Sequence, residues 1–442
     1  MRAHLVTIGL FFCVFFTAHA AFSNTAASFS IAPVSVLSST DYSGNFAGTN
    51  ILAPSGSNET LAVVGIVGDS SSPKVYSATV RMINATTFLP IGTDTSLTLA
   101  VKCITAPVVA QYSAGTVSMA CAEQRNSFNQ VFLHVWATST TSASTKQEVQ
   151  ITSNADSDIE YTIVASWYQG GYYFVAYTSH TTTASTSNDI YVQGISVSSV
   201  TTSGALFTTP LKINNAVTSM PDLILKCGQH GSYNKTYCIW RRGESNTVVG
   251  VTIDLNNKNV SSETTLFTDD TSTYYTPLSV VTGSDYYAAL VATSAPATSD
   301  EFTGIKAQLS FLTTVSTLNY TLPSDMTQFT LGGVIPYQAG WALLLNQYSA
   351  TASSVGVNAF QRDATINGTQ LALATDGTGA QLFVQANGSA YVMITNTNTN
   401  GGTPTEAYIG QLYHSIILPT FGKHLLPSLA FIVIALVAFF MI

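Results

Sequence analysis

A unit rich in strand-forming residues recurs along this chain and constrains its fold more than any other feature. The clearest copy contains four strand-like runs: YTIVASWYQ from Tyr161, YYFVAYTS from Tyr172, DIYVQGIS from Asp189 and ALFTTPLKI from Ala205. Val, Ile, Tyr and Thr favour strands, and the Gly and polar residues between the runs favour turns. We therefore expect an antiparallel unit of four strands, which we call first to fourth.

Two of the four strands can be followed through the chain. The second strand recurs as LAVVGI from Leu61, VSMACA from Val117, YCIWRR from Tyr237, YAALVA from Tyr287, ALLLNQ from Ala342 and YVMITN from Tyr391. The third recurs as YSATV from Tyr76, VFLHVW from Val131, VVGVTI from Val248, FTGIKA from Phe302, VGVNAF from Val355 and AYIGQL from Ala407. Seven copies, spaced by about 50 to 60 residues, predict an all-β fold, a seven-bladed β-propeller of four-stranded blades.

The two ends of the repeat array complement each other. The seventh copy ends after its third strand, and an additional strand, FSIAPVSVL from Phe29, precedes the first copy. We expect this N-terminal strand to complete the last blade, which would leave no sheet edge open. This closure favours a propeller over a solenoid or a row of sandwiches.

The third copy also resembles known propeller repeats. Its W-Y-x-G-G turn, Trp167 to Gly171, and its D-I-Y-x-Q strand, Asp189 to Gln193, are similar to repeats of many secreted and cell-surface proteins. The resemblance covers one unit well and implies a fold but no activity.

Both chain ends carry apolar segments with targeting character. Arg2, the apolar run from Leu5 to Phe16 and the spacing Ala18-His19-Ala20 predict a signal peptide over residues 1–20. The propeller ectodomain would span residues 21–420, and the apolar run 425–442 would be a C-terminal transmembrane helix or a GPI-anchor signal. No basic residue follows Ile442, which favours the lipid anchor. The predicted location is the extracellular face of the cell membrane.

Composition narrows the partners and predicts two crosslinks. Only 9% of the residues are charged and the net charge is -8, which argues against a nucleic-acid partner. Cys13 lies in the signal peptide, and the four remaining cysteines predict the disulfides Cys103–Cys121 and Cys227–Cys238. No C-x-x-C motif points to zinc.

The predicted blades have two faces. We call the loops between second and third strands, and those between blades, the upper face; the other loops form the lower face. On this strand map all the N-glycosylation sequons lie on or next to lower-face loops: Asn58, Asn84, Asn234, Asn259, Asn319, Asn367 and Asn387. The chain leaves the lower face toward its apolar tail, so the upper face is expected to point away from the membrane.

Charged residues gather in the upper loops and are our candidates for contacting a protein or glycan ligand. They are Arg125, Asp156, Asp158, Glu160, His180, Arg241, Arg242, Glu244, Asp300 and Glu301. The alternative is that surface loops simply hold most of the charge of any protein.

Specific chemistries are poorly indicated by the sequence. The alternating oxygen donors from Asn154 to Glu160 are similar to a calcium loop, but they lack its central Gly, and a solvated turn is the alternative.

A sialidase would need an S-x-D-x-G-x-x-T-W repeat, which is missing. A general glycosidase needs two carboxylates about 5 to 10 Å apart. Sequence alone selects no such pair, and we expect no metal or cofactor.

The sequence therefore favours a binding, recognition or adhesion module over an enzyme. The module would be held on the cell surface by its C-terminal tail and would use its sequon-free upper face. A glycan-processing hydrolase with upper-loop carboxylates and a structural coat protein are the alternatives.

Overall fold

The computed structural model describes most of the chain between Ser28 and Tyr413. The described residues are 28–29, 34–38, 45–52, 60–68, 76–91, 95–98, 103–104, 107–113, 116–138, 143–184, 187–199, 202–214, 218–219, 223–230, 234–242, 246–282, 286–294, 304–311, 314–321, 328–337, 340–348, 353–360, 371–374, 377–384, 390–396 and 406–413. The predicted signal peptide and the apolar tail 425–442 lie outside them. Within these residues, no helix has the length and apolar character needed to cross a bilayer.

The described strands form seven antiparallel sheets. The first sheet contains β3 (Asn45–Leu52), β4 (Thr60–Gly68), β5 (Tyr76–Asn84) and β6 (Thr95–Thr98). The second contains β7 (Val108–Ser113), β8 (Thr116–Arg125), β9 (Phe128–Thr138) and β10 (Ala143–Gln150). The third contains β11 (Ile159–Gln169), β12 (Tyr172–Thr181), β13 (Ser187–Ser199), β14 (Thr202–Ala205), β15 (Leu211–Lys212) and β16 (Thr218–Ser219), with the short 3-10 helix η2 (Thr182–Ala184) after β12.

The remaining sheets follow in chain order. The fourth contains β17 (Lys226–His230), β18 (Lys235–Arg242), β19 (Thr247–Asp254), β20 (Asn259–Val260) and β21 (Thr264–Thr268). The fifth contains β22 (Tyr274–Thr282), β23 (Tyr286–Ser294), β24 (Gly304–Phe311) and β25 (Thr314–Thr321). The sixth contains β26 (Gln328–Tyr337), β27 (Gly340–Tyr348), β28 (Ser353–Phe360) and β29 (Leu371–Ala374), and the seventh contains β30 (Gly377–Val384), β31 (Ala390–Asn396) and β32 (Glu406–Tyr413) together with β1 (Ser28–Phe29) and β2 (Val34–Ser38).

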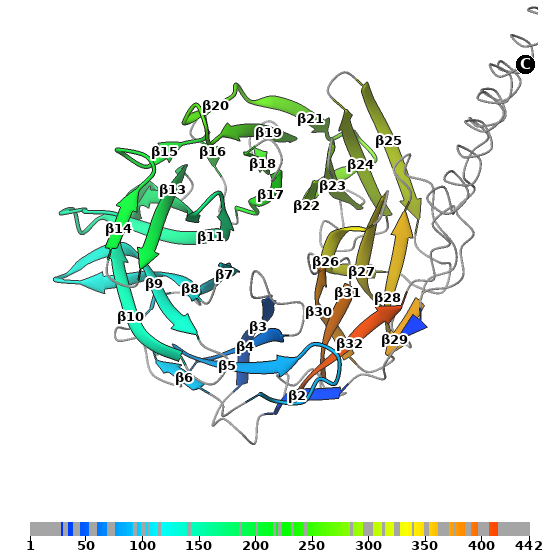
Figure 1. The fold of residues 1–442 in the computed structure, drawn as a ribbon. Coiled ribbons are helices and arrows are strands. Elements are labelled where there is room, and N and C mark those ends of the chain that lie inside the picture. Colours follow the sequence, from blue (N-terminus) through cyan, green and yellow to red (C-terminus); the bar gives the residue numbers. More distant parts are fainter. Residues whose placement is uncertain are drawn as a thin grey trace, which may run out of the picture.

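The sheets follow one another around a ring (Figure 1). The first strand of each sheet contacts the first strand of the next, in the order β3, β7, β11, β17, β22, β26 and β30, and β30 contacts β3. The first strands therefore form the inner edges of the sheets. The all-β prediction is confirmed.

The N-terminal strands lie in the last sheet, as the sequence predicts. β1 and β2 both pair antiparallel with β32, with Phe29 opposite Leu412 and Val34 opposite Ile409. The first and last parts of the chain are thereby joined by main-chain hydrogen bonds.

The expectation of four strands in every sheet is too simple, because some outer strands are broken. The third sheet has six strands, since β14, β15 and β16 pair with different parts of β13. The predicted continuous strand from Ala205 ends at once, and Pro210, which has no N–H to donate, precedes β15. Gln193 bridges the break, because its side-chain amide donates to Phe207 O at 3.0 Å and accepts from Phe207 N at 3.2 Å. This contact explains the glutamine of the D-I-Y-x-Q motif.

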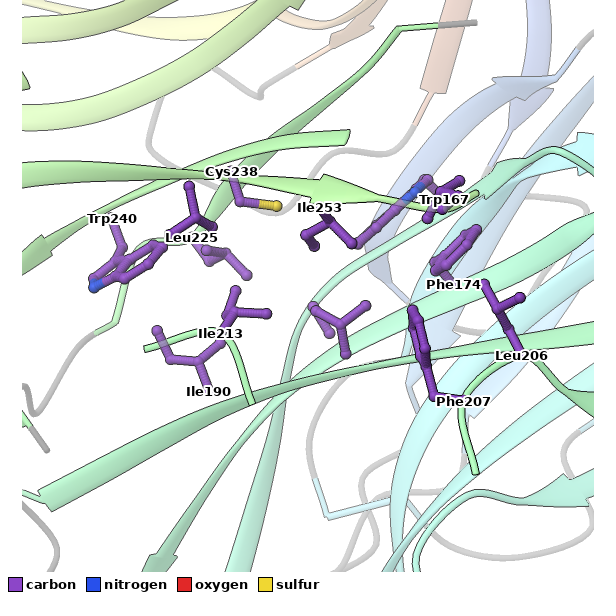
Figure 2. Close-up of a cluster of buried hydrophobic side chains, with 14 of the residues drawn as sticks. Trp167, Phe174, Ile190, Leu206, Phe207, Ile213, Leu225, Cys238, Trp240 and Ile253 are labelled. Atoms are coloured by element: carbon purple, nitrogen blue, oxygen red, sulfur yellow. The ribbon is translucent and has the colours of Figure 1, made fainter. Parts of the chain in front are cut away.

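Apolar side chains pack between neighbouring sheets. Between the third and fourth sheets, Trp167 stacks on Phe174 with ring centroids 5.2 Å apart, and Leu225 and Trp240 belong to the same buried cluster (Figure 2). Alternate residues of one strand serve opposite interfaces, as the two-residue period of a strand requires. In β9, for example, Leu133 packs toward the third sheet, whereas Trp136 belongs to the cluster shared with the first sheet.

Both predicted disulfides are present. Cys227 and Cys238 are directly opposite in the β17–β18 pair, with Cα atoms 4.1 Å apart. Cys103 is bonded to Cys121, and their Cα atoms are 5.8 Å apart. Cys103 is also bridged to Glu123 of β8, so this disulfide fixes the segment before β7 against the edge of the second sheet.

The sequon assignment needs one correction. Asn84 ends β5, Asn234 immediately precedes β18 and Asn259 begins β20, all beside lower-face connections as expected. Asn319, however, lies within β25 opposite Lys306. Because β25 already begins at Thr314, Asn319 is nearer to the end of this strand than to the lower face. The prediction that all seven sequons lie on or next to lower-face loops is therefore wrong for Asn319, while Asn58, Asn367 and Asn387 lie outside the described residues.

Candidate functional site

The described ligand-face candidates lie at the upper ends of the second, third and fourth sheets. Arg125 ends β8, His180 is next to last in β12, and the Arg241-Arg242 pair ends β18. Glu160 is near the start of β11, and Asp156 and Asp158 lie in the connection that precedes it. Glu244, Asp300 and Glu301 lie outside the described residues.

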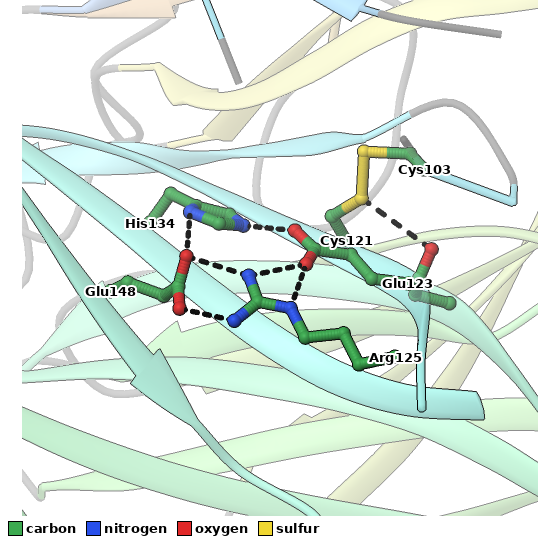
Figure 3. A network of polar contacts seen from close by, with 7 residues as sticks. Cys103, Cys121, Glu123, Arg125, His134 and Glu148 are labelled. Carbon is green, nitrogen blue, oxygen red and sulfur yellow. Dashed lines mark hydrogen bonds and ion pairs between the residues drawn. A yellow bond between two sulfur atoms is a disulfide. The ribbon is translucent and has the colours of Figure 1, made fainter. Parts of the chain in front are cut away.

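Arg125 is the centre of a polar network in the second sheet (Figure 3). Its Nε and Nη2 donate to Glu123 Oε2 at 3.0 and 2.8 Å, and Nη1 and Nη2 donate to the two oxygens of Glu148 at 2.6 and 2.7 Å. The guanidinium also lies over the ring of Phe132, 3.9 Å from its centroid. Hydrogen bonds to Glu148 and Glu123 raise the pKa of Arg125 further above its usual value. All three guanidinium nitrogens of Arg125 thus donate hydrogen bonds to carboxylates of the protein.

His134 is the buried member of this network. Its Nε2 lies 2.5 Å from Glu123 Oε1, and its Nδ1 lies 3.8 Å from Glu148 Oε2. His134 and Glu123 have no exposed side-chain surface, whereas the side chains of Arg125 and Glu148 are each 30% exposed. The network therefore extends from between the first and second sheets to the outer strand β10.

His134 and Glu148 were not among the residues predicted from the sequence. Both sit in strand-like runs, and their relation appears only from the pairing that sets His134 of β9 opposite Glu148 of β10. The available signal was the alternation Met119, Cys121, Glu123, which places a carboxylate on a buried face. Its partner could not be chosen without the register.

Glu123, His134 and Glu148 have the donor types of a metal centre, and their ligand atoms lie within 4.8 Å of one another. However, Arg125 already holds oxygens of both carboxylates, and its positive charge opposes a cation at the same place. Glu123 is also closed to solvent. The arrangement is an ion-pair network that ties β8, β9 and β10 together, and no substrate reaches its buried carboxylate.

Arg241 forms a similar contact set between the fourth and fifth sheets. Its Nη1 and Nη2 donate to the two oxygens of Asp269 at 3.0 and 2.5 Å, and Nη1 donates to Tyr275 O at 2.7 Å. The guanidinium lies 3.5 Å from the centroid of the Tyr274 ring. As for Arg125, an aromatic ring and a bidentate carboxylate hold the side chain in place.

The other described candidates are also engaged within the protein. Arg242 is paired with the buried Glu263, and His180 Nε2 lies 3.2 Å from Glu160 Oε2. The structure thus brings together His180 and Glu160, two residues that the sequence indicated separately as candidates for ligand contact. The described arginines and His180 of this face are thus each held by a carboxylate.

The loop from Asn154 to Asp158 is built as a turn. Asn154 Oδ1 accepts a hydrogen bond from Asp156 N, and Asp156 Oδ1 accepts one from Asp158 N, both at 2.9 Å. Buried Gln130 fixes the start of the loop, because its Oε1 accepts from Asn154 N at 3.0 Å. Asn154 Oδ1 and Asp156 Oδ1, which a calcium ion would need as ligands, instead accept hydrogen bonds from backbone N–H groups. These contacts favour the solvated-turn alternative.

Comparison with known proteins extends the fold assignment. No protein-family description matches the chain, and no curated protein is similar to it in sequence. Among solved structures, an ulvan lyase of polysaccharide lyase family PL25, solved with -[GlcA(1-4)Rha3S]- bound, has a TM-score of 0.55 at 6% identity, over 86% of this chain and 95% of the lyase. The β-propeller domain of the Trilobed protease from Pyrococcus furiosus has a TM-score of 0.47 at 10% identity, over 84% of this chain and 97% of that domain.

A third similar structure, the Dos1 propeller, has a TM-score of 0.48 at 8% identity, over 87% of this chain and 95% of the propeller. At these identities the likeness concerns the fold alone. The chain is an all-β protein, and two of these similar structures, the Trilobed protease domain and Dos1, are described as propellers.

Proposed function

We propose that this protein is an extracellular recognition module that binds a glycan through its upper face without transforming it. One observation carries the proposal: the described arginine and histidine candidates of that face, Arg125, His180, Arg241 and Arg242, are already held by carboxylates. Paired charges give a surface of fixed shape, which lowers the entropic cost of binding. They also neutralise carboxylates that the rival glycan-processing enzyme would need as acid and base.

A glycan suits the chemistry of this chain better than a highly charged partner. Only 9% of the residues are charged, whereas Ser, Thr, Asn and Gly are abundant, so hydrogen bonds rather than ion pairs dominate what the surface offers. The likeness to a lyase that holds a saccharide supports a saccharide ligand as part of this proposal. That likeness also makes a glycan-processing enzyme the alternative to be tested.

The proposed architecture is a closed seven-bladed propeller. The pairing of β2 with β32 and the contact of β30 with β3 support closure, and the seven sheets of the described residues support the blade number. Each broken outer strand would count as the fourth strand of its blade.

The proposed location is the outside of the cell. Two disulfides support an oxidising compartment. The signal peptide and the C-terminal anchor remain part of the proposal. Release of the protein from cells by a phosphatidylinositol-specific phospholipase would support a lipid anchor, and retention in the membrane would favour a transmembrane tail.

A pair of relocated glycans tests the face used for binding. Asp156→Thr creates a sequon at Asn154 on the upper face, and Asn259→Thr moves a lower-face sequon from Asn259 to Asn257. We expect full-length protein in detergent to bind components of a glycan array, and the glycan at Asn154 to block this binding while the glycan at Asn257 does not. Mass spectrometry would verify that both new sites are occupied.

The same preparation distinguishes binding from catalysis. Each bound polysaccharide is incubated with the protein, and new reducing ends and unsaturated products are measured. Binding without turnover supports the recognition module. Turnover that is lost in the Asp156→Thr variant would contradict it and favour the enzyme, and absence of binding to any glycan would reject the glycan ligand.

A further inference from the structure

The fifth sheet ends on its outer side in a long and regular strand, β25 (Figure 1). All eight residues of β25 pair with β24, from Thr314 opposite Phe311 to Thr321 opposite Gly304. Within the described part of the chain, no strand pairs with its other side. An antiparallel strand directs about half of its main-chain N–H and C=O groups away from a single neighbour, so β25 presents an unpaired edge.

The other outer strands of the described sheets are short or charged. With the exception of β10, they have at most five residues. β10 is as long as β25, but it contains Lys146 and Glu148. Short length and charged residues both discourage the pairing of an edge strand with another chain. These sheets therefore have a protection that can be recognised in their outer strands.

β25 has neither kind of protection. Its sequence is TVSTLNYT, which contains no charged residue and no proline. Thr, Val and Tyr are strong strand formers. An uncharged run of strand formers on an open edge is a template for pairing with another chain, and identical chains offer identical templates. The partner that this edge fits best is therefore β25 of a second copy of the protein.

The sequon that departs from the lower-face pattern lies on this strand. Asn319-Tyr320-Thr321 is contained entirely within β25, whereas Asn84 and Asn234 lie beside lower-face connections. An N-linked glycan is bulky and strongly hydrated. A pairing strand would have to lie about 4.8 Å from β25 and would bring the rest of its own sheet with it. A glycan on β25 would obstruct that approach.

We propose that Asn319 carries an N-linked glycan that prevents β25 from pairing with β25 of a second copy. The glycan takes the role that charge has in β10 and that short length has in the other outer strands. Without it, two copies would join their outer rims antiparallel about a two-fold axis, because each presents the same edge. This inference concerns the outer rim of the ring and is independent of the proposed glycan binding at the upper face.

The test measures self-association of the full-length protein in detergent by analytical ultracentrifugation over a range of concentrations. Thr321→Val and Asn319→Gln each remove the sequon, whereas Thr321→Ser keeps it. We expect the first two variants to reach half-association at a concentration at least about tenfold lower than the wild type, and Thr321→Ser to match the wild type. Mass spectrometry would verify a glycan at Asn319 in the wild type and in Thr321→Ser.

Two further variants separate edge pairing from a general loss of glycans or of folding. Asn259→Gln removes a sequon from β20, an outer strand of only two residues, and should behave like the wild type. Adding Thr317→Lys to Asn319→Gln places a charge on the bare edge and should restore the monomer.

Three results would overturn the inference. The first is an unoccupied Asn319 in the wild type. The second is a pair of sequon-free variants that associate no more than the wild type does. The third is association that persists after Thr317→Lys is added, because it would then not depend on the edge of β25. Circular dichroism of each variant would show whether association reflects misfolding, which would also count against pairing of native edges.

Discussion

Glu123 is a carboxylate without exposed surface whose two oxygens contact two different side chains, Arg125 and His134. Removing one member of a buried ion pair leaves the others uncompensated. We predict that Glu123→Gln lowers the free energy of unfolding by about 3 kcal/mol, measured by urea denaturation. Glu148→Gln is the control, because the side chain of Glu148 is 30% exposed, and it should cost about 1 kcal/mol or less. Equal losses in both variants would contradict the central place of Glu123.

Tyr177 makes stability sensitive to alkaline pH. Burial raises the pKa of its hydroxyl above the usual value of 10.0, and the nearby Tyr161 and Tyr191 raise it further. The unfolded chain therefore loses this proton near pH 10 while the folded protein keeps it, so stability is complete below pH 10 and falls as pH rises above it. We predict a shallower fall between pH 9 and about 11 for Tyr177→Phe, measured as the urea midpoint.

Tyr168→Phe is the control for this prediction. It removes a hydroxyl group from β11 of the same sheet, outside the ring contacts of Tyr177 with Tyr161 and Tyr191. An unchanged alkaline slope in Tyr177→Phe would show that other groups carry the effect.

Between elements, the β11–β12 hairpin of the third sheet is hydrogen-bonded to the fourth sheet through the side chain of Gln169. Gln169 of β11 donates to Lys235 O at 3.0 Å, and its Oε1 accepts from the Thr236 hydroxyl at 2.6 Å. Thr236 is fully buried, and loss of its hydroxyl leaves a buried acceptor. We predict that Thr236→Val lowers the free energy of unfolding by about 1 to 3 kcal/mol, measured by urea denaturation.

Thr236 also completes the sequon of Asn234, so two controls are needed. Thr236→Ser keeps both the hydroxyl and the sequon and should be close to the wild type. Asn234→Gln removes only the sequon. If Asn234→Gln is as destabilised as Thr236→Val, the loss comes from the glycan and not from the hydrogen bond.

The close contact of β17 with β22 depends on a glycine. An added Cβ at Gly228 would lie 2.5 Å from Val280 O, a backbone atom that cannot move alone. We predict that Gly228→Ala costs about 1 to 3 kcal/mol of stability, measured by urea denaturation. Gly204→Ala, where the nearest atom is the Ser196 side-chain oxygen at 3.1 Å, should cost clearly less. The reverse order would contradict tight packing between these inner strands.

Elements were predictable where a local pattern determines them. The second and third strands of each unit, the N-terminal strand and both disulfides follow from strand-forming runs and from cysteines that bracket short loops. The break after Ala205 was missed because a run such as ALFTTPLKI reads as continuous, although Pro210 interrupts the ladder. The Arg125 network was only partly seen, since Arg125 was selected as a loop charge while His134 and Glu148 join it through the register of β9 and β10.

For the whole molecule, the pairing of β2 with β32 closes the ring in our proposal. Replacing residues 28–38 by a Gly-Ser segment would leave β32 with an unpaired edge, and exposed edges promote association between chains. We predict lower thermal stability and concentration-dependent aggregation, measured by light scattering during heating. A monomeric variant with an unchanged melting temperature would show that closure contributes little.

The same pairing has a consequence for biosynthesis. Val34 and Ile409 are opposite each other in the sheet, and most of the chain lies between them in sequence. At a synthesis rate of about 5 to 20 residues per second, the N-terminal strand waits roughly 20 to 75 seconds before its partner exists. Throughout that time the strand keeps its hydrogen-bonding groups unpaired while the intermediate sheets are made. Folding of this protein therefore requires its earliest strand to be protected until its latest strand has been made.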